Sequence, residues 1–474
     1  MGILKFIIII LEVIVLFNLI IIVHELGHFL AAKWRGLYIE RFGVWFGKPL
    51  WERTIGGVKY SLGSIPAGGF VALPQMAPME ALEGDSDVVR EDLPQASVLD
   101  RIIVAAAGPL FSVLLAFAFA GIISLVGRPV SESERSAVVG YLPEGSPAAA
   151  AGLLPGDKIL SVDGFEVSRF NGVGKNSVQW RVISGENETV DLTYERDGET
   201  LSASIVPQAG QNRAFGRDTL RRISALPITT PIVDKPIENT PAEAAGLLAR
   251  DIIRAVNGEP VYHPAAVNKF ITDADVGTPL TFTVERDGSL QEIEIASAMI
   301  TPEGATEAIP MIGIQWDLGG IRELGFPSPM EQVRASVDTM FSTLGALFSP
   351  KSEVKAEHLS GPAGIMNLYY RLFESENGWR LAIWFSVVFN INLAILNMLP
   401  IPVLDGGHIT LALIEGAIRR PINVKILQAV QTGCAALLIG FMIYVTFFDV
   451  QDVFNLNPAK DPAVEETTEP IEQE

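Results

Sequence analysis

The sequence predicts an α-helical membrane protein in which four transmembrane helices carry a duplicated soluble insertion between the second helix and the third. The 474-residue chain is 49% hydrophobic and only 19% charged, whereas a soluble globular domain carries about 25% charged residues. The apolar residues gather in long stretches, and residues 130–325 are soluble in composition and repeat themselves. The formal net charge of -20 argues against a nucleic-acid-binding protein, because binding phosphates requires basic patches. The single cysteine, Cys434, excludes an internal disulfide framework and a Cys-rich metal site.

Four stretches are predicted to cross the membrane, because a bilayer core is spanned by about 20 apolar residues of helix. They are residues 7–23 together with 29–32, 102–126, 381–404 and 426–448. We expect the first stretch to be retained, because the apolar core of a signal peptide has only about 7–15 residues and ends at a cleavage site of small residues.

The charges of the short loops predict the orientation, since cytoplasmic loops carry an excess of Lys and Arg. Most of the charged residues at 33–59 are basic, and the loop between the third and fourth spans carries Arg419, Arg420 and Lys425. Both loops are therefore expected to be cytoplasmic, and the insertion and both chain ends external. Residues 449–474 carry almost only acidic charges and are predicted to form a solvated tail.

The insertion contains a duplication. The stretch AGLLPGDKILSVDG at 151–164 recurs as AGLLARDIIRAVNG at 245–258, and each copy follows a Ser-Pro or Thr-Pro helix start. The pattern resembles PDZ domains, which implies a groove between a strand and a helix that takes an extended peptide by strand addition. Residues 138–141 and 231–234 are expected to form the groove edges. The alternative is a pair of small β-rich spacer domains without a ligand.

The predicted organisation follows from these features. Residues 330–348 look amphipathic, with apolar residues at helical spacing, and are expected to lie on the membrane surface. The expected parts are an N-terminal membrane part at 1–127, the repeated domains at 128–225 and 226–325, a second membrane part at 326–448, and the acidic tail at 449–474.

The motif HELGH ends the first span and points to a metal. His24 and His28, at i and i+4, lie on one face of a helix and can bind one zinc ion at about 2.0–2.1 Å. Glu25 stands beside them and can act as general base toward a water on the metal. The alternative, two histidines that reach the headgroups, does not explain the glutamate between them.

A second polar cluster offers the missing ligand. Catalytic zinc takes three protein ligands and leaves one position for water, and Asp405 is the obvious third ligand. Pro400 and Pro402 break the third span, and unwound backbone at membrane depth requires burial in protein or a wet cavity. Gly406 and Gly407 are expected to let the chain turn tightly around Asp405.

HExxH in the first span and NxxPxPxLDGG at 397–407 resemble the paired motifs of the site-2 proteases, which are intramembrane zinc metalloproteases. With the duplicated insertion, nearly the whole chain resembles the bacterial regulator-of-sigma-E branch of that family. The resemblance implies a membrane re-entrant β-hairpin within residues 41–73, beside the active site. It also implies that His24, His28 and Asp405 are zinc ligands and that Glu25 is the catalytic base. Asn397 and Asn392 are implied to hydrogen-bond the substrate backbone. The alternative role for the two asparagines is contact between helices.

The resemblance implies regulated intramembrane proteolysis in a bacterial inner membrane. The expected substrates are single-span membrane proteins, such as a trimmed anti-sigma factor or a leftover signal peptide. The insertion would gate their access from the periplasmic side, and the active site would lie toward the cytoplasm. Two alternatives stay open, a non-catalytic PDZ scaffold with structural zinc and an intramembrane zinc or proton transporter.

Overall fold

A computed structural model describes residues 3–76, 93–94, 96–208, 217–302, 307–420 and 422–454. The chain divides into two compact units, which we describe separately. The membrane unit comprises residues 1–128, 326–341 and 359–457, and the second unit contains residues 129–325 and 342–358.

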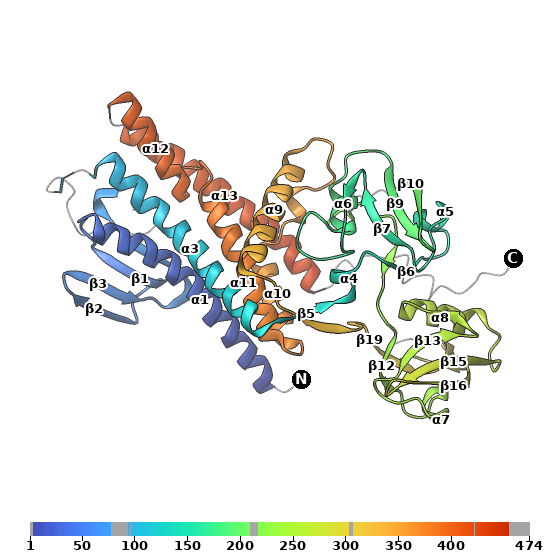
Figure 1. Ribbon diagram of the computed structural model, residues 1–474. Coiled ribbons are helices and arrows are strands. Elements are labelled where there is room, and N and C mark those ends of the chain that lie inside the picture. Colours follow the sequence, from blue (N-terminus) through green and yellow to red (C-terminus); the bar gives the residue numbers. More distant parts are fainter. Residues whose placement is uncertain are drawn as a thin grey trace. The chain divides into compact units, whose positions relative to one another are not determined.

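Four helices of the membrane unit are long and apolar enough to cross a bilayer, as predicted. They are α1 (Ile3–Trp34), α3 (Val98–Val126), α11 (Gly378–Asn397) and α13 (Val424–Val453). Helix α3 packs against both α1 and α11 (Figure 1). Their shared core holds Ile20 of α1, Ala116 and Ala120 of α3, and Ile391 of α11. Small buried residues such as these alanines let helices approach closely in a membrane.

The third span is shorter than expected. Helix α11 ends at Asn397, and the prolines at 400 and 402 lie in a non-helical loop that reaches residue 404. A proline removes one backbone N–H and clashes with the preceding turn, so the helix cannot continue through this loop. A further helix, α12 (Asp405–Ile418), then begins at Asp405 and packs against α3.

Residues 41–72 form a four-stranded sheet rather than a single hairpin. Its strands are β1 (Arg41–Phe46), β2 (Trp51–Ile55), β3 (Val58–Leu62) and β4 (Ile65–Ala72), in the order β2-β3-β1-β4. Strand β4 is an edge strand that packs against α1. A Cβ on Gly69 would lie 3.2 Å from Cγ of Glu25, so glycine lets this edge lie close to the HELGH turn. The short 3-10 helix η1 (Pro74–Met76) follows.

Two further helices complete the membrane unit. Helix α9 (Pro329–Phe348) coincides with the predicted amphipathic segment; its residues up to 341 belong to this unit, and its Val333 joins the core of α3 and α11. Helix α10 (Pro362–Glu374) packs against α11 and α13. The Gly364 N–H of α10 donates to Asp449 Oδ2 of α13 at 2.8 Å, where the helix dipole favours a negative charge. The predicted start of the tail at 449 therefore lies inside α13, and residues 455–474 lie outside the described residues.

The two repeats in the second unit share one order of elements up to their second long strand, after which the second copy adds the hairpin β17-β18 before its last strand. The first contains β6 (Val139–Tyr141), α5 (Pro147–Ala150), β7 (Lys158–Val162), β8 (Phe165–Glu166), α6 (Val178–Ser184), β9 (Val190–Arg196), β10 (Glu199–Ile205) and β11 (Leu226–Pro227). The second contains β12 (Ile232–Pro236), α7 (Pro241–Ala244), β13 (Ile252–Val256), β14 (Glu259–Pro260), α8 (Pro264–Asp273), β15 (Pro279–Arg286), β16 (Ser289–Ala296), β17 (Ala298–Ile300), β18 (Ile309–Met311) and β19 (Ile314–Asp317). Near the ends of the insertion, β5 (Arg128–Ser131) precedes α4 (Glu132–Arg135) and pairs with β20 (Arg322–Gly325), and the 3-10 helix η3 (Ala356–His358) comes later.

The duplication extends to an ion pair in which the carboxylate is buried. Arg196 Nη2 donates to Asp157 Oδ2 at 2.6 Å in the first copy, and Arg286 Nη2 donates to Asp251 Oδ2 at 2.6 Å in the second. Each aspartate also accepts a backbone N–H, from Leu154 or from its counterpart Leu248. Because a buried carboxylate is costly unless it is fully paired, both copies use the same set of donors to retain it.

The expected groove edges are wrong. Residues 139–141 form β6, but β11 pairs with its outer edge, and β19 covers β12 in the same way (Val233 opposite Trp316). In each copy the chain returns after the long hairpin (β9-β10 or β15-β16) and adds the outermost strand, β11 or β19. The cavity beside α6 is accordingly lined by residues 220–227, and the cavity beside α8 by residues 309–314 and Trp316.

Candidate metal centre

The HELGH residues occupy the C-terminal part of α1. His24 and His28 are one turn apart, and their side chains are buried, with 7% and 5% of their surface exposed. Their Nε2 atoms lie 3.3 Å from each other. The two imidazoles are therefore directed to one point, as the i, i+4 spacing predicts.

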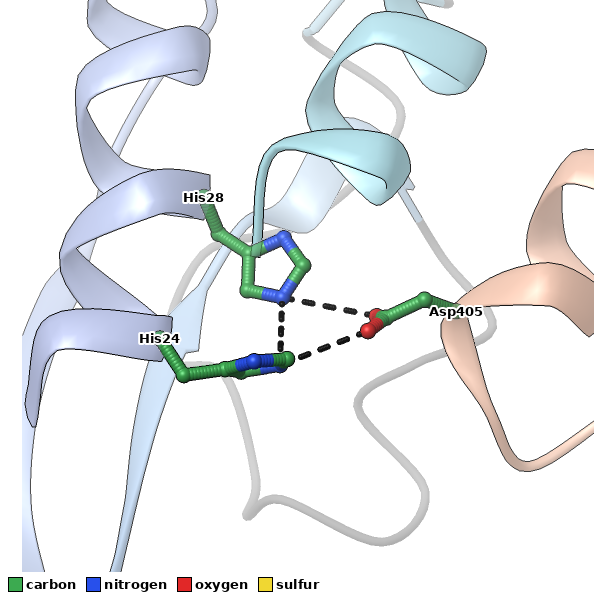
Figure 2. A group of neighbouring side chains, drawn as sticks. All are labelled: His24, His28 and Asp405. Carbon is green, nitrogen blue, oxygen red and sulfur yellow. Dashed lines mark hydrogen bonds and ion pairs between the residues drawn. The ribbon is translucent and has the colours of Figure 1, made fainter. Parts of the chain in front are cut away.

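Asp405 approaches the same point from the first turn of α12 (Figure 2). Its Oδ2 lies 3.3 Å from His24 Nε2, and its Oδ1 lies 3.4 Å from His28 Nε2. The carboxylate is also buried, with 8% of the residue exposed. The structure thus brings together the three side chains that sequence motifs about 380 residues apart predict as ligands.

These separations fit a zinc ion. A tetrahedral zinc with bonds of about 2.0–2.1 Å sets its ligand atoms about 3.3–3.4 Å apart, and all three measured distances agree. Hydrogen bonds explain the triangle less well. The Val104 carbonyl lies 2.8 Å from His28 Nδ1 and can only accept, so neutral His28 presents an Nε2 lone pair to the carboxylate. A cation between them removes this repulsion.

Helix α3 provides the other side of the centre. His28 Nδ1 faces the Val104 carbonyl, and His24 Nδ1 lies 2.9 Å from Ser112 Oγ. Between these contacts, a Cβ on Gly108 would lie 2.1 Å from His28 Nε2 and 2.8 Å from His24 Nε2. Residues 104, 108 and 112 are spaced four apart, which puts them on one face of α3. This face of α3 was not predicted, and the only signal for it in the sequence is a glycine and a serine at that spacing within a span.

The two glycines after Asp405 have a different role from the one expected. They form the first turn of α12, and neither has a positive φ. A Cβ on Gly406 would lie 2.2 Å from the Met398 carbonyl oxygen, and one on Gly407 would lie 2.1 Å from that of Ile401. Glycine is needed here because α12 starts in direct contact with the loop before it.

The other predicted site residues differ in position. Glu25 and Asn397 line the same cavity of about 140 Å³ as His24, His28 and Asp405, together with Val71 of β4 and Leu73 just after it. Asn397 Nδ2 lies 3.4 Å from His24 Nε2. Asn392 lies earlier on α11 and does not line this cavity, and its Oδ1 is buried without a hydrogen-bond partner among the described residues.

The chain matches one family model over most of its length. Residues 12–441 match peptidase family M50. The regulator of sigma-E protease of Salmonella typhimurium is 29% identical over 433 residues, covering 87% of this chain and 92% of its own. That of Escherichia coli is 28% identical over 460 residues, covering 92% and 97%. A protein of Pasteurella multocida named as a zinc metalloprotease is 29% identical over 459 residues, covering 92% and 97%.

Among solved structures, the PDZ domain of an SdrC-like protein from Listeria innocua matches 19% of this chain and 93% of its own, with 24% identity and a TM-score of 0.16. The family match, by contrast, includes both motifs and reaches into all four apolar helices. The chain therefore belongs to peptidase family M50 and is a zinc metalloprotease.

Proposed function

We propose that this protease hydrolyses peptide bonds within transmembrane segments of single-span membrane proteins. We assign His24, His28 and Asp405 as zinc ligands and Glu25 as the catalytic base. The observation that carries the proposal is the buried triangle of ligand atoms at tetrahedral spacing, which lies among helices apolar enough to span a bilayer. A hydrolytic site at membrane depth is accessible to substrates that approach it within the bilayer, which favours transmembrane segments as substrates.

The chemistry follows from the residues around the cavity. Bound zinc supplies a Lewis acid, which polarises the scissile carbonyl and makes the attacking water more acidic. Glu25 accepts a proton from this water and passes it to the leaving amine. The Asn397 amide lies beside His24 and donates to the substrate backbone near the scissile bond.

The substrate must be unwound before it can be cut, because the carbonyls of a helix are hydrogen-bonded within it. Strand β4 offers replacement partners. It is an edge strand packed on α1, and its Gly69 lies close to Glu25. An extended substrate segment added to this edge would recover backbone hydrogen bonds and lie beside the catalytic base.

We further propose that the repeats are PDZ-like domains whose peptide-binding grooves differ in volume. The groove beside α6 in the first copy has a volume of about 660 Å³, whereas the groove beside α8 in the second has about 90 Å³. In the second copy, residues of β18 line the groove, and Trp316 Nε1 lies 3.3 Å from Asn268 Oδ1 of α8. The second groove is therefore largely filled by its own side chains.

The first groove has a feature suited to an acidic group. Arg221 is 5% exposed and lines the groove, and its Nη1 donates to the carbonyls of Gly185 and Asn187. Its Nη2 is buried and has no hydrogen-bond partner among the described residues. Because a buried guanidinium N–H without a partner is costly, we assign this groove to peptides that bring a carboxylate.

The insertion is proposed to lie on the external side and to keep untrimmed substrates from the site. The basic loops after α1 and before α13 support this sidedness, and the active site then lies toward the cytoplasm. On this account, deletion of residues 130–325 lets the protease cut substrates that still carry an external domain. Cleavage of trimmed and untrimmed versions of one single-span substrate, co-expressed with each protease, tests this.

The deletion variant must still cut the trimmed substrate, which shows that its membrane unit is intact. The same deletion combined with Glu25→Gln is the matched control for cleavage by other proteases. If the deletion variant cuts the trimmed substrate and still rejects the untrimmed one, the gating role is refuted.

A further inference from the structure

The imidazole of His24 is held from two sides. Its Nε2 faces Asp405, and its Nδ1 lies 2.9 Å from the hydroxyl of Ser112 on α3. Ser112 is completely buried, with 0% of its surface exposed. The equivalent atom of His28 faces a backbone carbonyl, that of Val104. Among the described residues, Ser112 is thus the one side chain that contacts Nδ1 of either histidine.

We infer that Ser112 is a positioning residue that sets the tautomer and the ring orientation of His24, an inference that rests on the proposed zinc site. An imidazole that binds zinc through Nε2 must carry its proton on Nδ1. The Ser112 hydroxyl oxygen accepts this N–H, which favours the tautomer that the metal requires. Partners of this kind commonly orient the histidine ligands of zinc.

The geometry of α3 supports this role. Val104, Gly108 and Ser112 are spaced four apart, and the first and the last contact His28 and His24, which are themselves four apart on α1. Gly108 leaves the space that both rings occupy. Helix α3 therefore presents two hydrogen-bond acceptors and one gap to the metal-ligating face of α1.

Loss of the hydroxyl has a defined consequence. Without an acceptor, the Nδ1–H would be buried and unpaired, which is unfavourable. The proton would then shift to Nε2, where Asp405 accepts it, and an Nε2 that carries a proton cannot bind zinc. Removal of the hydroxyl should therefore weaken zinc binding even when the fold is unchanged.

The test compares Ser112→Thr with Ser112→Val in the full-length protein. These two side chains have nearly the same shape and differ in the hydroxyl, so a packing effect is common to both. Zinc affinity is measured by competition with a chromophoric chelator in detergent, and coordination by the visible absorption of the cobalt-loaded protein. We expect Ser112→Thr to bind zinc like the wild type, and Ser112→Val to bind it about 10- to 100-fold more weakly with an altered cobalt spectrum.

Ser386→Ala is the matched control. Ser386 is also a fully buried helical serine of the membrane unit, but its hydroxyl contacts the Ala382 carbonyl and the Tyr369 hydroxyl. Its removal should leave zinc affinity unchanged. Equal zinc affinity and equal cobalt spectra for Ser112→Thr and Ser112→Val would overturn the inference alone. A wild-type protein that binds no zinc would overturn the proposed function as well.

Discussion

Glu25→Gln should strongly reduce proteolysis while the protein keeps its zinc. The substitution retains the size of the side chain but removes its ability to accept a proton from water. General base catalysis contributes about 10²- to 10⁴-fold, and we expect a loss in that range. The three side chains that we propose as zinc ligands are unchanged, so metal content should stay at the wild-type level. Single-turnover cleavage of a single-span substrate, together with zinc analysis of the same preparation, measures both quantities.

Glu12→Gln provides the control for this experiment. Glu12 lies on the same helix but is exposed on its surface, away from the cavity that Glu25 lines. The control variant should cleave at the wild-type rate. If Glu25→Gln cleaved as fast as Glu12→Gln, another residue would have to be the base, and the assignment of HELGH as a catalytic motif would be wrong.

Gly108→Ala should remove zinc and activity together. A Cβ at this position would lie 2.1 Å from His28 Nε2 and 2.8 Å from His24 Nε2, the two atoms assigned to the metal. Either the rings or α3 must move by about 1 Å, and displacements of this size cost about 10²-fold in activity. We therefore expect at least that loss, with zinc content well below one ion per chain, measured by elemental analysis of the purified protein.

Gly121→Ala tests the same substitution on the same helix where there is room for it. Among the described residues, no atom beyond the helix's own backbone and the adjacent residues lies within 4 Å of the added Cβ at residue 121, and alanine is the better helix former. This variant should retain wild-type zinc content and activity. A Gly108→Ala protein that held zinc as firmly as Gly121→Ala would contradict the close packing of α1 and α3 described above.

The side chains that we propose as zinc ligands could be singled out from sequence because each motif is local. The i, i+4 spacing of His24 and His28 determines that their rings share a helix face, whatever the rest of the chain does. Asp405 was identifiable because a carboxylate next to a helix break at membrane depth has few other uses. The side chains that Asp405 contacts, however, depend on how α12 packs against α3. That packing cannot be predicted from a local sequence pattern.

The contributions of α3 and of the outer strands could not be predicted for the same reason. Val104, Gly108 and Ser112 are ordinary residues for a membrane span, and their role appears only when α3 lies against α1. Likewise, β11 pairs with β6 across about 85 residues of intervening chain, and its own two residues carry no strong strand signal. Which strand edge remains unpaired depends on pairing between distant segments. The local sequence pattern indicates where strands form, but not how distant strands pair.

The number of ligands also bears on the alternative functions. A structural zinc in a scaffold is usually enclosed by four protein ligands, whereas the described part of the chain offers a group of three. Glu25, which we propose as the catalytic base beside them, would have no role in a scaffold. A transporter would need a path of polar groups across the membrane, and its test is zinc flux into liposomes that contain the purified protein.

The most direct test of the central claim is to map the cleavage site in a purified system. Wild-type protein and a single-span substrate are combined in liposomes, and the products are identified by mass spectrometry. Our account predicts a cut within the apolar segment of the substrate that stops when zinc is removed by a chelator and resumes when zinc is restored. Cleavage only outside the apolar segment, or cleavage that continues without zinc, would contradict it.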